Sequence, residues 1–454
     1  MPHTSVNPAD GRLIASYPDW DSGALNNALE LAHVAWRTWR FTSFDHRAEL
    51  MHEACLHLRT NLETHATLIS EEMGKPLREA RAEVEKCALA CEYYALWARH
   101  FLQEEPVESD AGRSYVAYQP LGTLLAVMPW NFPYWQVFRA AVPALMAGNV
   151  VALKHASNVP RIALALEKLF RDSGFPEGIF TTLMIGAGQV AEAIASPFVH
   201  AVTLTGSENA GRRVAETAGR HLKKCVLELG GSDPFIVFAD ADLEAAANAA
   251  IASRYQNCGQ SCIAAKRLIL APEIADRFVS LLVAKADELK VGDPVNEETQ
   301  IGPMARADLR DELHRQVTDS INQGAQPLLG CQPLPGEGAY YLPSVLDRVT
   351  PGMRAYREEL FGPVMAVIRA EDEEDALRIA NDTPFGLGAS LWSQDTQRAE
   401  MLSAAIEAGC AFINGMVKSD PRLPFGGIKA SGFGRELSYH GIREFVNAKT
   451  VWLR

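Results

Sequence analysis

The sequence predicts an α/β protein with a parallel, doubly wound sheet, and three observations support that prediction. Apolar runs such as 123–128, 201–205 and 267–270 are typical of strands that are buried on both faces, and a further strand is expected over 181–185. Segments with apolar residues at three- and four-residue spacing separate these runs, and strands that alternate with helices form parallel β-α-β units. The chain has 454 residues, which exceeds one ordinary core, so two or three domains are expected.

The composition is that of a globular protein with an acidic surface. Hydrophobic residues make up 48% of the chain and charged residues 22%. Forty-three Lys and Arg against 56 Asp and Glu leave a net charge of −13, which opposes nucleic acid and anionic membranes as partners. The N-terminus has no basic segment followed by an apolar one, and no run of about 18 apolar residues occurs, so we expect a soluble, cytoplasmic protein.

The 8 cysteines are few for this length and are expected to be reduced thiols. Cys258 and Cys262 lie one helical turn apart, as do Cys87 and Cys91, but no histidines are placed to complete a zinc site. We therefore expect no metal. Cys258 is expected to pack in the interior, and a disulfide with Cys262 is the alternative interpretation.

Residues 21–100 carry the apolar spacing of several helices, which polar residues and glycines separate. We expect these helices to be scaffold without a role in the chemistry. Two strands follow, 113–119 and 123–128, around a Pro-Gly turn, and the first is expected to be an exposed hairpin arm. A C-terminal strand over 447–453 is expected to pair with this arm or with another subunit.

Polar residues follow several of the predicted buried strands, where α/β proteins place their ligands. Asn131 comes after strand 123–128, between aromatic residues and prolines, and is either a rigid amide donor to an oxyanion or a turn residue. The Thr-Gly-Ser sequence at 205–207 precedes a helix over 208–218 and predicts a phosphate-binding helix N-terminus. A Gly-x-Gly-x-x-Ala loop at 186–191 lacks the acidic residue of a dinucleotide fingerprint and is a weaker signal.

Cys262 lies just past a Gly-Gln-Ser turn, with no histidine within about thirty residues, so a nucleophilic role requires another base. Glu228 follows the apolar run 225–227 and precedes a glycine pair. A thiolate is a strong nucleophile and a poor base, so an attacking cysteine and a carboxylate that activates water form a coherent pair for acyl transfer. The alternatives are a buried, hydrophobic cysteine and a glutamate at an ordinary strand end.

Six motifs together resemble the aldehyde dehydrogenase superfamily over nearly the whole chain. They are, in family order, Pro-Trp-Asn-Phe-Pro at 129–133, Leu-Thr-Gly-Ser at 204–207, Glu-Leu-Gly-Gly at 228–231, Gly-Gln-Ser-Cys at 259–262, Glu-Glu-Leu-Phe-Gly-Pro at 358–363 and Pro-Phe-Gly-Gly at 424–427. The resemblance implies an aldehyde dehydrogenase-like α/β fold, with a doubly wound cofactor domain, an α/β catalytic domain and a bridging β-hairpin with the C-terminal strand. The implied ranges are 1–105 and 123–230 for the dinucleotide-binding domain, 231–423 for the catalytic domain, and 106–122 with 437–454 for the bridging element of a homodimer or homotetramer.

The resemblance also implies the roles of single residues. Cys262 is the nucleophile, Asn131 and the Cys262 backbone N–H hold the oxyanion, and Glu228 activates the water that hydrolyses the thioester. The implied reaction is the oxidation of a small aldehyde with NAD or NADP. The implied cofactor contacts are Trp130, Lys154, Gly206, Ser207, Glu359 and Phe361.

The residues after Lys154 depart from the common family pattern. Many members have Pro-Ser-Glu or Pro-Ala-Glu there, whose glutamate binds the adenosine ribose hydroxyls, whereas this chain has His-Ala-Ser at 155–157. A glutamate would repel a 2′-phosphate, while Ser157 can donate to it and Lys154 can neutralise it. We therefore expect NADP to be preferred over NAD.

The predicted substrate depends on Arg139, in the helix that follows the Pro-Trp-Asn-Phe-Pro motif. Succinate-semialdehyde dehydrogenases have an arginine at this place that binds the far carboxylate, and the stretch leading to it, which includes Trp135, resembles a bacterial branch of them. Ser419 matches a second carboxylate contact. Gln256 is a mismatch, because mitochondrial-type enzymes carry another arginine there, so carboxylate recognition is expected to be weaker or broader.

The sequence leaves several alternatives open. Arg139 can be a surface arginine without a ligand, and the substrate can be glutarate semialdehyde or a broad range of aldehydes. A CoA-acylating enzyme is disfavoured, because such members usually lack the base that Glu228 supplies. An inactive structural or binding protein on the same fold is disfavoured by the joint presence of Cys262, Glu228 and Asn131.

Overall fold

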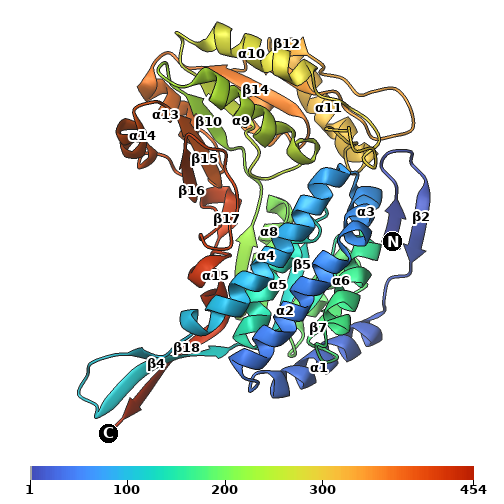
Figure 1. Ribbon diagram of the computed structural model, residues 1–454, viewed down its shortest axis with the longest axis vertical. Helices are drawn as coiled ribbons and strands as arrows, with labels where there is room; N and C mark the ends of the chain where they lie inside the picture. The colour runs from blue at the N-terminus through green and yellow to red at the C-terminus, as the bar shows by residue number, and fades with distance from the viewer. Residues whose placement is uncertain (1–2) are drawn as a thin grey trace.

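The computed structural model describes residues 3–454, which form two lobes and a projecting arm (Figure 1). A short strand pair, β1 (His3–Val6) and β2 (Leu13–Tyr17), begins the chain. Four helices follow, as the spacing over 21–100 predicts, and α4 packs against α2 and α3. Their bounds are Ser22–Trp39 (α1), Phe44–Thr60 (α2), Leu62–Met73 (α3) and Leu77–Phe101 (α4).

One lobe contains a six-stranded sheet in the order β17-β9-β8-β5-β6-β7, parallel except for the pairing of β17 with β9. Helices cover both faces of it (Figure 1). The strands are β5 (Thr123–Met128), β6 (Val150–His155), β7 (Phe180–Thr182), β8 (Ala201–Thr205), β9 (Lys224–Glu228) and β17 (Gly432–Phe433). The helices between them are α5 (Trp135–Ala147), α6 (Pro160–Asp172), η1 (Ala187–Gln189), α7 (Val190–Ala195) and α8 (Glu208–Arg220).

Strand β7 is shorter than the predicted strand over 181–185. The Leu183 backbone N–H still donates to the Leu153 carbonyl of β6 at 2.7 Å, whereas the Met184 carbonyl accepts a hydrogen bond of 2.7 Å from the Trp20 backbone N–H. The end of this strand is therefore set by a contact with the N-terminal segment, which the local sequence does not reveal.

The strand order creates a crevice at the carboxyl ends of β5 and β8. The chain runs from β5 through β6 to β7 at one edge and then returns, so that β8 and β9 lie on the other side of β5. Connections that leave in opposite directions open a ligand site in α/β sheets. Asn131 follows β5, and Gly206 and Ser207 follow β8, so these three residues come to the same crevice.

The other lobe contains a seven-stranded sheet in the order β12-β13-β14-β11-β10-β15-β16, in which only β12 is antiparallel to its neighbour. The predicted second α/β unit is thus present. Its strands are β10 (Pro234–Val237), β11 (Arg267–Leu270), β12 (Gln326–Leu329), β13 (Ser344–Asp347), β14 (Val364–Arg369), β15 (Gly388–Trp392) and β16 (Cys410–Ile413). Its helices are α9 (Leu243–Tyr255), η2 (Gln256–Gly259), α10 (Ala275–Asp287), α11 (Ala307–Asn322), α12 (Arg354–Arg357), α13 (Glu373–Asn381) and α14 (Thr396–Ser403).

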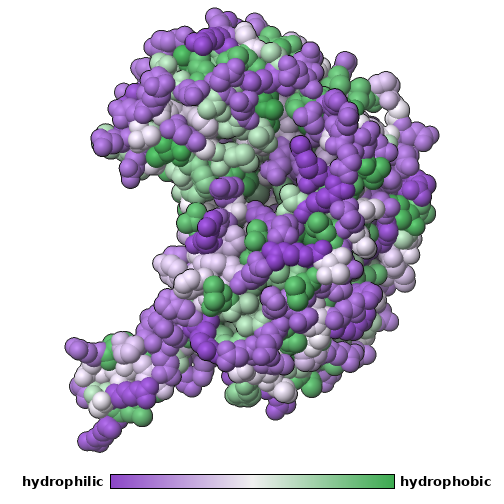
Figure 2. All heavy atoms as spheres, in the orientation of Figure 1, coloured by the Kyte–Doolittle hydropathy of each residue, from purple (hydrophilic) through white to green (hydrophobic). Residues whose placement is uncertain are grey.

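The arm is a three-stranded antiparallel sheet of β3 (Glu105–Pro106), β4 (Arg113–Pro120) and β18 (Val446–Leu453). The arm projects from the lobe with the six-stranded sheet (Figure 1). The molecular surface is hollowed between the arm and the other lobe (Figure 2). Of the two predicted partners of the C-terminal strand, the hairpin arm is the observed one. Before β18 the chain passes through η3 (Lys429–Ser431) and α15 (Ser438–Glu444).

Candidate active site

Cys262 lies just past a tight turn that connects α9 to β11. Asn257 and Cys258 have left-handed backbones, with φ of 54° and 53°, and Gly259 follows with φ of 70°. A β-carbon on Gly259 would lie 2.3 Å from the Gly362 carbonyl oxygen, so only glycine fits there. Cys258 is buried, and all 8 cysteines are free thiols, as predicted.

Asn131 is buried against this turn. Its Nδ2 donates to the Gln260 carbonyl at 3.1 Å, and its own carbonyl accepts from Asn257 Nδ2 at 2.7 Å. A side-chain amide carries two N–H donors, so one hydrogen of Asn131 is left for a ligand. Asn131 and Cys262 line one cavity of about 300 Å³, here called the inner cavity, together with Trp130, Gly206, Ser207, Glu359 and Phe361.

Burial and nearby charges have opposite effects on the pKa of the Cys262 thiol. Burial raises its pKa to about 12, whereas the positive charges of Arg139 and Lys266 lower it. The thiol is therefore protonated at neutral pH in the free protein. The two cations are placed to stabilise a thiolate when the proton leaves.

Glu228 is 1% exposed, and neither oxygen of its carboxylate has a hydrogen-bond partner among residues 3–454. Burial raises its pKa well above the usual range, Arg139 opposes that rise, and Glu436 adds to it. Glu228 does not line the inner cavity, but Arg139 acts electrostatically on both Glu228 and Cys262. The absence of a side chain at Gly426 makes room for it, because a β-carbon there would lie 2.7 Å from Glu228 Oε1.

Lys266 is a site residue that the motifs did not indicate. Its side chain is 1% exposed, and its Nζ donates to the carbonyls of Ser261 and Cys262 at 2.6 and 2.8 Å. It also forms an ion pair of 3.1 Å with Glu359, which accepts from the Gly231 backbone N–H at 3.2 Å. Its position four residues after Cys262 is a signal that sequence reasoning could have used.

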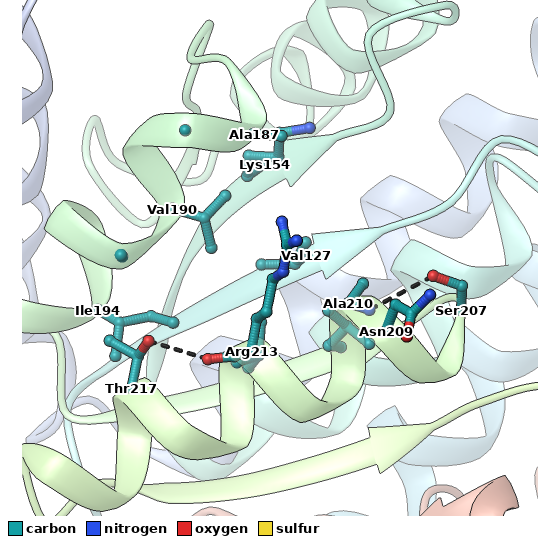
Figure 3. A pocket seen from close by; sticks show the side chains of 14 residues that line it. Val127, Lys154, Ala187, Val190, Ile194, Ser207, Asn209, Ala210, Arg213 and Thr217 are labelled. Atoms are coloured by element: carbon teal, nitrogen blue, oxygen red, sulfur yellow. Dashed lines mark hydrogen bonds between the residues drawn. The ribbon is translucent and has the colours of Figure 1, made fainter.

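A second cavity of about 560 Å³, here called the outer cavity, opens along α8 (Figure 3). Ser207 begins α8 by accepting a hydrogen bond from the Ala210 backbone N–H at 3.4 Å, and it lines both cavities. Lys154 forms part of the wall, and burial lowers the pKa of its amine. Arg213, which the sequence analysis did not select, extends from α8 toward Val127 in Figure 3.

The two cavities fit a dinucleotide. Together they offer a helix N-terminus for phosphate, the cations Lys154 and Arg213, and an aromatic pair, Trp130 and Phe361, whose rings lie 5.8 Å apart. The Gly-x-Gly-x-x-Ala loop also belongs to the outer cavity, through Ala187, Gly188, Val190 and Ala191. The loop thus forms part of the wall of this cavity although it lacks the acidic residue of the fingerprint.

Ser157 lies just beyond β6 and is exposed. Its carbonyl accepts a hydrogen bond of 3.0 Å from the Thr4 backbone N–H. It is not part of the outer cavity wall that holds Lys154. The assignment of Ser157 to a 2′-phosphate therefore stays a prediction.

A third cavity of about 130 Å³, here called the Arg139 pocket, meets the inner cavity at Cys262. It is lined by the predicted substrate contacts Arg139, Trp135 and Ser419, and by Gln256. Arg139 is not a surface arginine: it is 2% exposed, forms an ion pair with Glu436 and donates to Thr205 Oγ1 at 3.2 Å. Its charge is thus shared with a buried carboxylate, which the sequence analysis did not foresee.

Helix α4 contributes a further cation to the Arg139 pocket. Lys86 lines it, and Lys86 Nζ donates to Ser419 Oγ at 2.8 Å. The helices over 21–100, which were expected to be scaffold, thus place one side chain in the wall of this pocket. The lysine lies 333 positions before Ser419, so no local pattern could have connected them.

Neither a metal-binding cluster nor a membrane-spanning helix is found among the described residues. Residues 3–454 hold no group of three or more His, Cys, Asp or Glu side chains that could bind a metal ion. Within the same residues, no helix is both long and apolar enough to cross a bilayer.

A doubly wound sheet with a dinucleotide-sized cleft that ends at a cysteine defines a thiol-dependent oxidoreductase. Comparison with known proteins agrees with this class. The model of the aldehyde dehydrogenase family matches residues 2–451, and the chain belongs to that family. The predicted family and fold are thereby confirmed.

Individual relatives cover almost the full chain. It is similar to a succinate semialdehyde dehydrogenase of Escherichia coli (strain K12) named for NAD(P)+, with 50% identity over 99% of this chain and 97% of the relative. It is 48% identical to a succinate-semialdehyde dehydrogenase of Mycobacterium ulcerans (strain Agy99) named for NADP+, over 100% of both chains. A crystal structure of the succinic semialdehyde dehydrogenase of Streptococcus pyogenes with NADP+ has a TM-score of 0.97 and 37% identity, over 99% of both chains.

Proposed function

We propose that this chain oxidises succinate semialdehyde to succinate, with NADP+ as the preferred oxidant and NAD+ as a second. The carrying observation is the junction at Cys262 between the inner cavity and the cation-lined Arg139 pocket. A short aldehyde with a far carboxylate matches a pocket of about 130 Å³ with Arg139 and Ser419 in its wall. The names of the relatives support the same substrate and cofactor.

Cys262 begins the reaction by losing its proton to solvent, which the charges of Lys266 and Arg139 favour. The sulfur then forms a bond with the aldehyde carbon, and the carbonyl oxygen becomes an oxyanion. The free hydrogen of the Asn131 amide and the Cys262 backbone N–H donate to this oxyanion. The collapse of the oxyanion expels a hydride and leaves a thioester on Cys262.

NADP+, when bound, supplies the hydride acceptor. We assign it to the domain of residues 1–105 and 123–230, and the nucleophile to residues 231–423. Glu359 would bind the nicotinamide ribose, Ser207 and Gly206 the pyrophosphate, and Lys154 and Ser157 the 2′-phosphate. Trp130 and Phe361, which line the inner cavity, would also contact the cofactor.

Glu228 acts in the second half of the reaction. Its carboxylate takes a proton from water, the water oxygen attacks the thioester carbon, and the carbon–sulfur bond breaks to release succinate and the Cys262 thiolate. A carboxyl group whose pKa burial raises is a stronger base once ionised, which suits this role.

A substrate panel tests the proposal. Succinate semialdehyde, glutarate semialdehyde and hexanal are compared with NADP+ and NAD+, and kcat/KM is expected to be highest for succinate semialdehyde with NADP+. Arg139→Ala is expected to raise KM for succinate semialdehyde about 10-fold more than KM for hexanal, because it removes a charged partner of the carboxylate. A higher kcat/KM for hexanal or for glutarate semialdehyde would reject the proposed substrate.

We also propose that the protein works in the cytoplasm as a homodimer or homotetramer. The eight-residue strand β18 forms an edge of the arm sheet, and an unpaired edge of this length suits strand addition by another subunit. Free thiols at all 8 cysteines suit a reducing compartment. Light scattering coupled to size exclusion measures the oligomeric state, and a monomeric mass would reject the assembly.

A further inference from the structure

Lys86 lies in a part of the chain that carries none of the six motifs, yet its amine faces the Arg139 pocket. Its Nζ lies 4.2 Å from the centroid of the Trp135 ring and donates to Ser419 Oγ at 2.8 Å. Cys262 lines the same pocket. The amine of Lys86 and the thiol of Cys262 thus belong to one pocket.

Lys86 forms no direct ion pair with a carboxylate of the described residues. No Asp or Glu oxygen of residues 3–454 lies within 4.0 Å of its amine, whereas Arg139 is paired with the buried Glu436. Burial, with a smaller effect of Arg139, lowers the pKa of Lys86 to about 8, so the amine still carries its proton at pH 7. A half-buried cation whose direct contacts, Ser419 and the Trp135 ring, are neutral favours the arrival of an anion.

Ser419 completes the arrangement. Its Oγ accepts hydrogen bonds from Trp135 Nε1 at 3.0 Å and from Lys86 Nζ at 2.8 Å. A hydroxyl has two lone pairs and one hydrogen, so these two donors leave the hydroxyl hydrogen to be donated. Lys86 and Ser419 therefore present an ammonium group and an O–H donor side by side, which is a donor set for a carboxylate.

We propose that Lys86 is the main charged contact of the substrate carboxylate, with Ser419 as its hydrogen-bonding partner. Gln256, on the same pocket wall, contributes an amide and no charge, so Lys86 supplies the second cation that the sequence appeared to lack. The inference rests on the proposed function, since it requires a substrate that carries a carboxylate. It assigns specificity to a helix outside all the motifs.

Two substrates and three variants of the full-length enzyme test this inference. Succinate semialdehyde is compared with its methyl ester, which has the same aldehyde and no carboxylate charge. Lys86→Met is expected to raise KM for the acid by about 10- to 100-fold more than KM for the ester, because it removes a charge-assisted hydrogen bond. Lys86→Arg is expected to restore most of the preference for the acid, since it retains the charge.

Lys418→Met is the matched control. Lys418 also lines the pocket but is exposed, so solvent screens its charge and a change of less than about threefold in the same ratio is expected. Equal effects of Lys86→Met on acid and ester, equal behaviour of the Met and Arg variants, or an effect of Lys418→Met as large as that of Lys86→Met would each overturn the inference.

The same data separate this inference from the proposed function. A wild-type enzyme that does not prefer the acid over the ester rejects the function itself. A wild-type enzyme that prefers the acid, with a Lys86→Met variant that keeps the preference, rejects only the role of Lys86. Thermal stabilisation by succinate gives a readout independent of turnover: it is expected in the wild type and lost in Lys86→Met, and its persistence in the variant would count against the inference.

Discussion

Lys266 Nζ lies 3.1 Å from Glu359 Oε1 while it donates to the carbonyls of Ser261 and Cys262. One buried amine thus connects the nucleophile turn to a carboxylate in the wall of the inner cavity. The positions of the Cys262 sulfur and the Glu359 carboxylate are therefore coupled, because the ammonium group of Lys266 contacts both the turn and the carboxylate.

Lys266→Met is expected to lower kcat about 10- to 100-fold, because the variant loses the cation that favours the Cys262 thiolate and a restraint on its turn. Removal of the positive charge raises the thiol pKa further, so alkylation of Cys262 by iodoacetamide at a given pH should be slower. The rate of alkylation against pH measures this shift. Lys266→Arg is the control, and an unchanged alkylation profile in Lys266→Met would contradict the assignment.

Glu228→Gln is expected to form the thioester but to hydrolyse it slowly. The amide cannot accept the proton of water, and loss of a general base costs about 100- to 10,000-fold. Rapid mixing should show a burst of about one NADPH per active site, followed by a slow steady state. Intact-mass analysis should detect an acylated Cys262; a variant with neither burst nor adduct would place Glu228 outside this step.

Ser157→Glu is expected to raise KM for NADP+ about 10-fold or more and to change KM for NAD+ much less. A carboxylate at this position repels a 2′-phosphate at short range. Ser157→Ala, which removes only a hydrogen bond, serves as the matched control with a smaller expected effect. Initial rates with both cofactors measure the change, and an equal effect of the two variants on NADP+ would refute a charge-based contact.

The pH dependence of KM reports the charge of Lys86. Burial has the largest effect on the pKa of the Lys86 amine and lowers it to about 8, and the charge of Arg139 also lowers it. Cys87, Glu83 and Asp420 raise this pKa. The ammonium is present below that pH and lost above it, so KM for succinate semialdehyde should rise as the pH passes 8. KM for the methyl ester, measured in the same buffers, should not rise, and Lys86→Arg should remove the inflection.

The stability of the fold depends on a buried ion pair that involves helix α4. Lys75 and Glu83 form an ion pair in which both side chains are at most 2% exposed, and Glu83 also accepts from the backbone N–H groups of Tyr134 and Trp135 at 2.9 Å. Lys75→Met leaves the carboxylate uncompensated, and a loss of about 3–5 kcal/mol of stability is expected. Denaturant titration measures this loss.

The control for the ion-pair prediction is Arg99→Met. Arg99 pairs with Asp45 on the surface of the same helix, with side chains 60% and 74% exposed. Exposed pairs contribute at most about 1 kcal/mol, so this variant should be close to wild type. Similar losses in both variants would show that burial of the Lys75 pair carries no special weight.

The sequence predicted a strand correctly where an apolar run and the turn beside it specify the strand. The strand predicted over 201–205 coincides with β8, and the apolar run at 267–270 coincides with β11. An apolar run that ends in a Gly-Ser turn specifies its own strand, because side-chain burial and turn chemistry act over a few residues. The end of β7 was predicted wrongly, because a contact with Trp20 decides it.

By itself the sequence determined the two α/β units and the family. It also identified Cys262, Glu228 and Asn131 as candidate site residues, because each of these three lies in a short motif that can be recognised without the fold. Only the tertiary structure decided which charges meet at the site. It paired Arg139 with Glu436 and brought Lys86 to Ser419 across 333 positions. Ion pairs and pocket walls join residues that are distant in the chain, so their partners are set by packing and not by neighbours in sequence.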